Sequence, residues 1–177
     1  LFRSVSSGGN AAGLLKAFHE WSEAGLSETL PSLLCVQSTG CAPLASAFER
    51  SELKPVEIGE PNTIAHAISN PHPPSGARLL RELGNGERGW VVGVTDREIE
   101  AAQSLLAEEE GLFVQPDAAA SLAGLMSALR RSVIGTPRRA VLILTGHGLK
   151  DPSVFDRLEI SVQTSSAVDL ERKLSGE

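Results

Sequence analysis

The stretch Gly89-Trp90-Val91-Val92-Gly93-Val94-Thr95-Asp96-Arg97-Glu98 decides the fold class. Its first six residues form a short, mostly apolar run, which is typical of a strand that is covered on both faces. Thr95, with Glu98 three residues later, has the form of a capping box and predicts the start of a helix. That helix ends at Gly111 and turns one apolar face inward, with Ile99, Ala102 and Leu106. A buried strand that leads directly into an amphipathic helix predicts a β/α unit.

The same alternation extends over the rest of the chain. Further strands are expected at Leu33–Gln37, at Leu112–Val114 and at Ala140–Leu144, the last as a third buried strand. A helix with Leu14, Leu15, Phe18 and Trp21 on one face is expected after Asn10. Other helices are expected at Cys41–Phe48, Thr63–Ile68, Ser75–Leu83, Asp117–Arg130 and Val168–Leu174. The pattern predicts an α/β fold with a mostly parallel, twisted sheet flanked by helices.

The composition excludes several classes of protein. The chain has 177 residues, 41% hydrophobic and 21% charged, which suits one globular domain. Its net charge of -6 provides no basic surface for nucleic acid, and no apolar run approaches the roughly 20 residues of a membrane helix. Cys35 and Cys41 are too few for a disulfide framework, so a reducing, cytoplasmic setting is expected. They are not accompanied by a His or Cys cluster, so no metal site is predicted.

Ser6-Ser7-Gly8-Gly9-Asn10 is the first candidate binding segment. Its glycines allow a close approach of the backbone to an anion, and the helix that follows points free N–H groups and its positive dipole end at the same place. The serine hydroxyls and the Asn10 amide add hydrogen-bond donors. The segment is therefore a candidate phosphate-binding loop, although an ordinary turn and helix cap would have the same sequence pattern.

Leu144-Thr145-Gly146-His147-Gly148 is the second candidate binding segment. It directly follows an expected strand, and ligands of open parallel sheets bind at the carboxyl ends of strands. The two glycines allow unusual backbone angles that would leave Thr145 facing the crevice. Its hydroxyl would suit a ring nitrogen as hydrogen-bond partner, whereas a simple strand-ending turn is the alternative.

Taken together and in this order, the segments resemble threonine synthases, which are members of the β family, or fold type II, of pyridoxal-phosphate enzymes. The loop Ser6–Asn10 falls where the family has its Gly-Asn-Gly/Ala-Gly-Asn phosphate loop. The other matching segments are Val36–Leu44, Thr63–Pro71, Phe113–Leu125 and the distinctive run Leu144–Asp151. The resemblance covers nearly the whole chain.

The resemblance implies the large domain of a fold type II enzyme with pyridoxal 5'-phosphate as cofactor. Ser6, Ser7, Gly8, Gly9 and Asn10 would bind the cofactor phosphate, and Thr145 would face the pyridine nitrogen. The implied reaction converts O-phosphohomoserine and water to threonine and phosphate. The implied partner is thus a small amino-acid phosphoester, with no nucleic acid and no membrane; a homodimer is compatible with it.

Three departures from the family pattern accompany the resemblance. Ser6-Ser7 replaces the usual Gly-Asn, and Asp117 stands where a small residue is usual. No lysine matches the family's Schiff-base lysine, since this chain has only Lys16, Lys54, Lys150 and Lys173. We therefore expect residues 1–177 to be the C-terminal part of a catalytic domain, inactive alone and without a catalytic residue of its own.

Two other interpretations follow from the same residues. The nearest rivals are sister enzymes of the β family: threonine or serine dehydratase, cysteate synthase and cysteine synthase. The missing lysine and the altered loop also suit a non-catalytic α/β module that binds a phosphorylated ligand. The run Leu144–Asp151 favours threonine synthase over its sister enzymes.

Overall fold

The structure, a computed structural model, describes residues 1–151, 166, 169, 171–172 and 175. The expected helix at Val168–Leu174 therefore lies largely outside the described residues. The helices are α1 (Gly9–Glu23), α2 (Pro43–Glu49), α3 (Gly76–Leu83), α4 (Asp96–Glu110) and α5 (Pro116–Arg130). Short 3-10 turns are η1 (Thr39–Cys41), η2 (His66–Ile68), η3 (Gly84–Gly86) and η4 (Gly148–Lys150). The strands are β1 (Phe2–Ser4), β2 (Leu33–Ser38), β3 (Gly89–Val94) and β4 (Leu142–Ile143).

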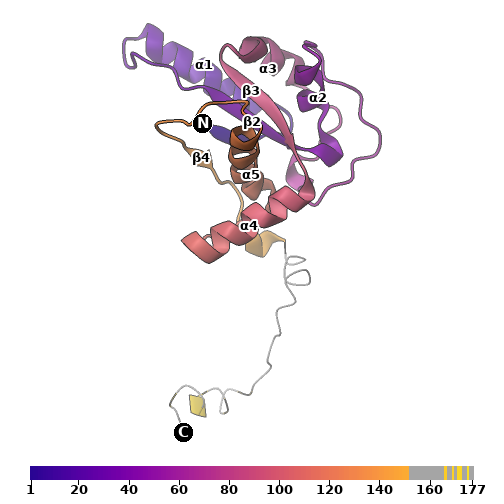
Figure 1. Cartoon of the computed structure of the whole chain (residues 1–177), viewed down its shortest axis with the longest axis vertical. Coiled ribbons are helices and arrows are strands. Elements are labelled where there is room, and N and C mark those ends of the chain that lie inside the picture. The colour runs from indigo at the N-terminus through magenta and orange to yellow at the C-terminus, as the bar shows by residue number, and fades with distance from the viewer. Residues whose placement is uncertain (152–165, 167–168, 170, 173–174, 176–177) are drawn as a thin grey trace.

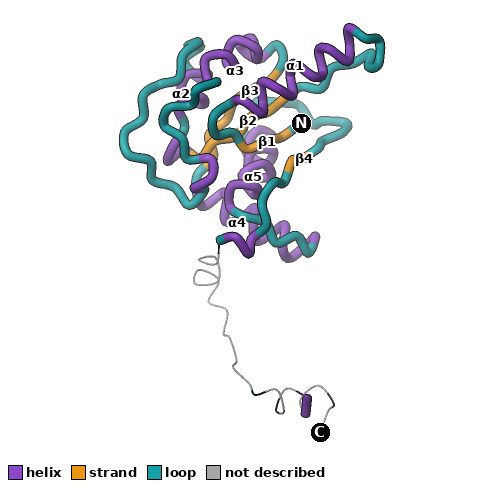
Figure 2. The backbone as a smooth tube through the Cα atoms, turned by 180° about the vertical axis from the view of Figure 1, so that it is seen from behind, coloured by secondary structure: helices purple, strands orange, loops and turns teal. Residues whose placement is uncertain are grey.

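The four strands form one sheet in the order β3-β2-β1-β4, and every neighbouring pair is parallel. Helices cover both faces: α1, α2 and α3 lie on one side and α4 and α5 on the other (Figures 1 and 2). Parallel strands need crossover connections, and here helices supply them. The predicted fold class, an α/β fold with a parallel sheet flanked by helices, is confirmed.

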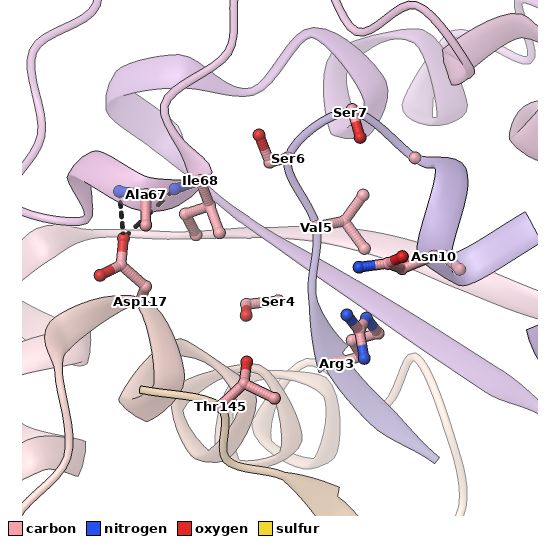
Figure 3. A pocket seen from close by; sticks show the side chains of 12 residues that line it. Arg3, Ser4, Val5, Ser6, Ser7, Asn10, Ala67, Ile68, Asp117 and Thr145 are labelled. Carbon is pink, nitrogen blue, oxygen red and sulfur yellow. Dashed lines mark hydrogen bonds between the residues drawn. The ribbon is translucent and has the colours of Figure 1, made fainter. Parts of the chain in front are cut away.

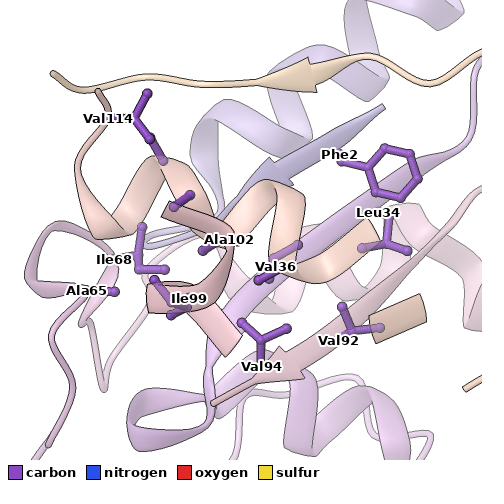
Figure 4. Packing of buried hydrophobic residues seen from close by; sticks show 14 of the residues in the cluster. Phe2, Leu34, Val36, Ala65, Ile68, Val92, Val94, Ile99, Ala102 and Val114 are labelled. Carbon is purple, nitrogen blue, oxygen red and sulfur yellow. The ribbon is translucent and has the colours of Figure 1, made fainter. Parts of the chain in front are cut away.

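Two apolar cores fill the space between these layers. Alternate residues of β2 point to opposite faces, so that Leu34 and Val36 pack toward α4 and α5, while Leu33 and Cys35 pack toward α1, α2 and α3. Figure 4 shows the first core, in which β2 and β3 contribute valines opposite Ile99 and Ala102 of α4. Because β2 is buried on both faces, its sequence is continuously apolar up to Gln37.

The helix α5 approaches the sheet unusually closely at Gly124. A Cβ atom placed on this glycine would lie 2.2 Å from Cγ2 of Val36, far inside van der Waals contact. Alanines at 119, 120 and 123 surround it and are almost fully buried. This small-residue face lets α5 rest directly on β1, β2 and β3.

The strand expected at Ala140–Leu144 is shorter and less buried than the sequence indicates. Only Leu142–Ile143 form β4, which is an edge strand, and Val141 is 48% exposed. Leu112–Val114 forms no strand with the described residues either, because its only ladder contact among them is an isolated antiparallel bridge between Val114 and His147. Burial varies along these runs, since Val114 is buried and Leu142 and Ile143 are only half-buried, and length and hydrophobicity alone do not reveal this.

One more expectation needs correction. The segment Thr63–Ile68 forms only the 3-10 turn η2, since its backbone donors are taken by side chains from elsewhere in the fold. The apolar face expected for α1 is buried only in part, since Leu15 is buried with Ala11 and Ala12 whereas Trp21 is exposed. Trp21 instead packs edge-on against Phe18, with ring centroids 5.9 Å apart.

The capping box at the start of α4 is confirmed. The Thr95 hydroxyl accepts a hydrogen bond from the backbone N–H of Glu98, and the Glu98 carboxylate accepts from the backbone N–H of Thr95. Partial burial alone would raise the pKa of Glu98. The hydrogen bonds from Thr95 and the ion pair with Arg130 outweigh it, so the pKa lies below its ordinary value of 4.5.

We expect Glu98→Gln to lower the free energy of unfolding at neutral pH by about 0.3–1 kcal/mol, because it removes a negative charge that interacts favourably with the positive dipole end at the helix N-terminus. The lowered pKa means that the carboxylate stabilises the folded state above the unfolded-state pKa. This contribution is lost as the pH falls through the folded-state pKa. Urea unfolding across the acidic range should therefore show the two proteins converging at low pH. Glu108→Gln, at an exposed position of the same helix, is the control; a pH-independent difference for Glu98→Gln would contradict the prediction.

Candidate functional site

The turn between β1 and α1 holds the predicted phosphate loop. Gly8 adopts a left-handed conformation, with φ of 86°, and a Cβ there would lie 3.3 Å from the carbonyl of Ser75. The Ser75 N–H donates to the Ser7 carbonyl at 3.0 Å, which fixes the turn against the start of α3. A glycine is therefore required at position 8 for both its backbone angle and its close contact.

The first turn of α1 leaves backbone donors available. No side chain caps this helix, and its first backbone bond runs from the Ala12 N–H to the Gly8 carbonyl. The N–H groups of Gly9, Asn10 and Ala11 precede that bond, so they have no acceptor within the helix. Together with the helix dipole, they make this end attractive to an anion.

Thr145 lies just after β4, in a turn that is fixed by the segment Phe113–Gln115. The Gln115 N–H donates to the Gly146 carbonyl at 3.1 Å, and the Gly148 N–H donates to the Phe113 carbonyl at 3.0 Å. Gly146 has φ of 119°, and a Cβ on it would lie 2.4 Å from Oε1 of Gln115. A glycine is therefore favoured at 146 by its backbone angle and at 148 by the Phe113 ring, whose atoms would lie 2.5 Å from an added Cβ.

Ser121 of α5 separates the ends of β1 and β4. The ladder between these strands pairs Arg3 with Ile143 and goes no further. One step beyond, the Ser121 hydroxyl accepts from the Ser4 N–H at 3.1 Å and donates to the Ile143 carbonyl at 3.2 Å. The hydroxyl takes the place of a direct bond between the strands, so their carboxyl ends diverge and leave an opening.

A pocket of about 170 Å³ occupies this opening. It brings together the two segments that the sequence singled out, since Ser6, Ser7, Gly8 and Asn10 line it from one side and Thr145 from the other (Figure 3). Gly9 is adjacent but is not among the lining residues. Residues more than a hundred positions apart thus meet where neighbouring parallel strands end, as ligand sites in such sheets do.

Asp117 shapes a further wall of the pocket. This buried carboxylate, at the start of α5, accepts hydrogen bonds from the N–H groups of Ala67 at 2.6 Å and Ile68 at 3.2 Å (Figure 3). Asp96, at the start of α4, similarly accepts from the Ile64 N–H at 3.0 Å and from the Thr63 hydroxyl at 2.6 Å. Two carboxylates therefore hold the segment Thr63–Ile68, which contributes Ala67 and Ile68 to the lining.

Arg3 of β1 also lines the pocket, although no local sequence pattern points to it. Its neighbour across the sheet is Cys35. Burial raises the pKa of the Cys35 thiol to about 12, although the positive charge of Arg3 acts to lower it. The thiol is therefore neutral near neutral pH and does not balance the charge of Arg3.

Two of the lining residues, Arg3 and Ser4, project from β1. This three-residue strand is not among the strands that the sequence pattern predicts. Asp117 stood out as unusual, but its role in holding η2 depends on a contact across 50 positions.

Within the part of the chain that the structure describes, no helix has the length and apolarity needed to cross a membrane. No group of three or more His, Cys, Asp or Glu residues suited to a metal ion occurs there either.

The fold and the pocket define a class: α/β proteins that bind a ligand at the carboxyl ends of parallel strands, against a glycine turn and a helix N-terminus. Comparison with known proteins narrows the class to a family. Residues 1–146 match the family model described as pyridoxal-phosphate dependent enzyme. The chain belongs to this family.

Its relatives include curated threonine synthases. The chain is 38% identical to that of Methanocaldococcus jannaschii over 86% of its length, and 35% identical to that of Methanosarcina acetivorans over 96%. It spans only 38% and 42% of these two relatives. Solved structures include threonine deaminase isoform 2 from Solanum lycopersicum, with a TM-score of 0.67 at 18% identity, covering 92% of this chain and 44% of that one. Maize serine racemase has a TM-score of 0.65 at 17% identity, covering 88% and 45%, and these two likenesses show the fold type.

Proposed function

We propose that this chain supplies the phosphate-binding and ring-nitrogen side of the active site in a threonine synthase-like enzyme. The observation that carries the proposal is the meeting of Ser6, Ser7, Gly8 and Asn10 with Thr145 in one pocket. The 35–38% identity to curated threonine synthases supports this reaction over those of the sister enzymes.

The residues of the pocket fit pyridoxal 5'-phosphate. The uncapped first turn of α1 and the hydroxyls of Ser6 and Ser7 are donors of the kind that a phosphate group requires. The pocket, at about 170 Å³, is smaller than the roughly 300 Å³ or more of a complete small-molecule site. It suits one wall of a site whose other wall, including a Schiff-base lysine, lies in a further part of the enzyme.

Bound here, the cofactor would supply the electron sink for chemistry at the substrate's carbon atoms. The residues of this chain have binding and orienting roles. The turn Ser6–Asn10 holds the phosphate group, and this fixes one end of the cofactor. The Thr145 hydroxyl would be the hydrogen-bond partner of the ring nitrogen, and as a neutral group it would not favour protonation of that nitrogen as a carboxylate would. The buried Ile68 provides an apolar surface on this side of the pocket.

The proposed substrate is O-phosphohomoserine, and the proposed products are threonine and phosphate. The proposal follows from the curated relatives, each named as a threonine synthase. We place the enzyme in the cytoplasm, and we propose that the chain does not complete the reaction alone, because none of its lysines matches the family's Schiff-base position.

The test is a chimeric enzyme in which this chain replaces the matched 38% of the M. jannaschii threonine synthase. We expect the chimera to release inorganic phosphate from O-phosphohomoserine and to form threonine, while this chain alone does neither. The same chimera with Thr145→Val retains the size of the side chain but loses the hydroxyl, and should be clearly slower. A folded chimera that turns over free serine but not O-phosphohomoserine would assign the chain to a sister enzyme. A folded chimera without any turnover would favour the non-catalytic module.

A further inference from the structure

We propose that Arg3 is an anion-binding residue of the pocket, and that it holds the phosphate group of the ligand together with the first turn of α1. The inference rests on the proposed function and extends it to a residue outside the phosphate loop. Neither the loop sequence nor the turn geometry predicts a role for this side chain.

The position of Arg3 follows from the register of β1. It pairs with Cys35 on one side and with Ile143 on the other, and it is the last residue before β1 and β4 diverge. Its side chain lines the pocket together with Asn10 and Thr145. Figure 3 shows its guanidinium group between these two residues, at the base of the turn that leads into α1.

The charge of Arg3 has no counterion within the described part of the chain. None of the ion pairs found there involves it. Cys35, its neighbour in the sheet, is a neutral thiol. Asp117 is the carboxylate that lines the same pocket, and its Oδ1 already accepts two backbone hydrogen bonds. A half-buried guanidinium in this setting favours an anionic ligand group.

The composition of the loop explains why this charge is needed. Ser6 and Ser7 offer neutral hydroxyl donors, and the helix end offers only partial charge. A phosphate monoester carries about -1.5 to -2 charges at neutral pH. A guanidinium group binds such an anion through two parallel N–H bonds, which adds both charge and direction. Arg3 thus supplies the full positive charge that the serine-containing turn lacks.

The test compares two probes without an aldehyde, so that no Schiff base forms with surface lysines: pyridoxamine 5'-phosphate and pyridoxamine. Their binding is measured by fluorescence titration of the whole chain. We expect the wild type to prefer the phosphorylated probe. Arg3→Gln should weaken pyridoxamine 5'-phosphate by about tenfold or more, in line with the loss of a charged hydrogen-bond pair. Pyridoxamine should bind both proteins equally, and Arg3→Lys should restore part of the preference.

Arg78→Gln is the matched control, because it removes the same charge from an exposed position on α3. This variant should bind both probes as tightly as the wild type does. Equal binding of pyridoxamine 5'-phosphate by wild type and Arg3→Gln would overturn the role of Arg3 and leave the proposed function standing. A wild type that does not distinguish the two probes would overturn the phosphate site itself. Equal weakening of both probes by Arg3→Gln would show a structural role and would likewise overturn the inference.

Discussion

Replacing Gly124 by alanine will lower the free energy of unfolding by about 1–3 kcal/mol, the cost typical of overpacking a core. The added methyl group would lie 2.2 Å from Cγ2 of Val36, and neither partner can easily move. Val36 is fully buried in β2, while α5 packs on β1, β2 and β3 together. Urea unfolding monitored by circular dichroism measures the effect.

Gly13→Ala is the matched control, since Gly13 is also inside a helix. It is exposed and has nothing within 4 Å of an added Cβ. Here alanine should raise the free energy of unfolding by about 0.5–1 kcal/mol through the better helix propensity of alanine. The same substitution in two helices should thus change the free energy of unfolding in opposite directions. A stabilising Gly124→Ala would show that α5 does not rest on β2 as closely as described.

Asp117→Ala should cost roughly 1–3 kcal/mol of stability, because it removes a buried carboxylate that accepts two backbone hydrogen bonds. The Ala67 N–H loses the acceptor that it has in the wild type, whereas the Ile68 N–H keeps the Ala65 carbonyl, 3.2 Å away. The loss should also loosen this wall of the pocket, so that pyridoxamine 5'-phosphate binds more weakly. Thermal unfolding and fluorescence titration measure the two effects.

Asp117→Asn separates hydrogen bonding from charge. Its amide oxygen can still accept from both N–H groups, so we expect it to retain most of the stability that alanine loses. If asparagine and alanine were equally destabilising, the negative charge rather than the hydrogen bonds would be the stabilising feature. If both variants were as stable as the wild type, Asp117 would not hold the segment Thr63–Ile68 in place.

The parts of the fold that the sequence predicted well are those in which local pattern and burial agree. β3 and α4 are bounded by Gly89, the Thr95 cap and Gly111, and each boundary is a local chemical feature. β1 is not predicted from the sequence, because three residues that include an arginine and a serine show no recognisable hydrophobic periodicity. β4 was expected to be longer and more deeply buried, since an apolar run does not tell an edge from the middle of a sheet.

The residues of the candidate site likewise fall into those that a local pattern predicts and those that only the fold reveals. The turn Ser6–Asn10 and Thr145 could be selected because glycines next to small polar residues after a strand are a local signal. Arg3 and Asp117 could not, because their positions depend on sheet order and on contacts between distant segments. Whether these residues bind the cofactor stays a prediction for the titrations described above.

The hydroxyl of Ser121 has a consequence for how such a site changes over evolutionary time. One oxygen atom, on a helix that carries neither of the two binding turns, bridges the ends of β1 and β4 where their direct pairing stops. Mutation at this single position can therefore widen or narrow the aperture while both binding turns keep their sequences. In the proposed site, the width of the opening and the chemistry of the lining thus depend on different residues, so a lineage can alter one and inherit the other unchanged.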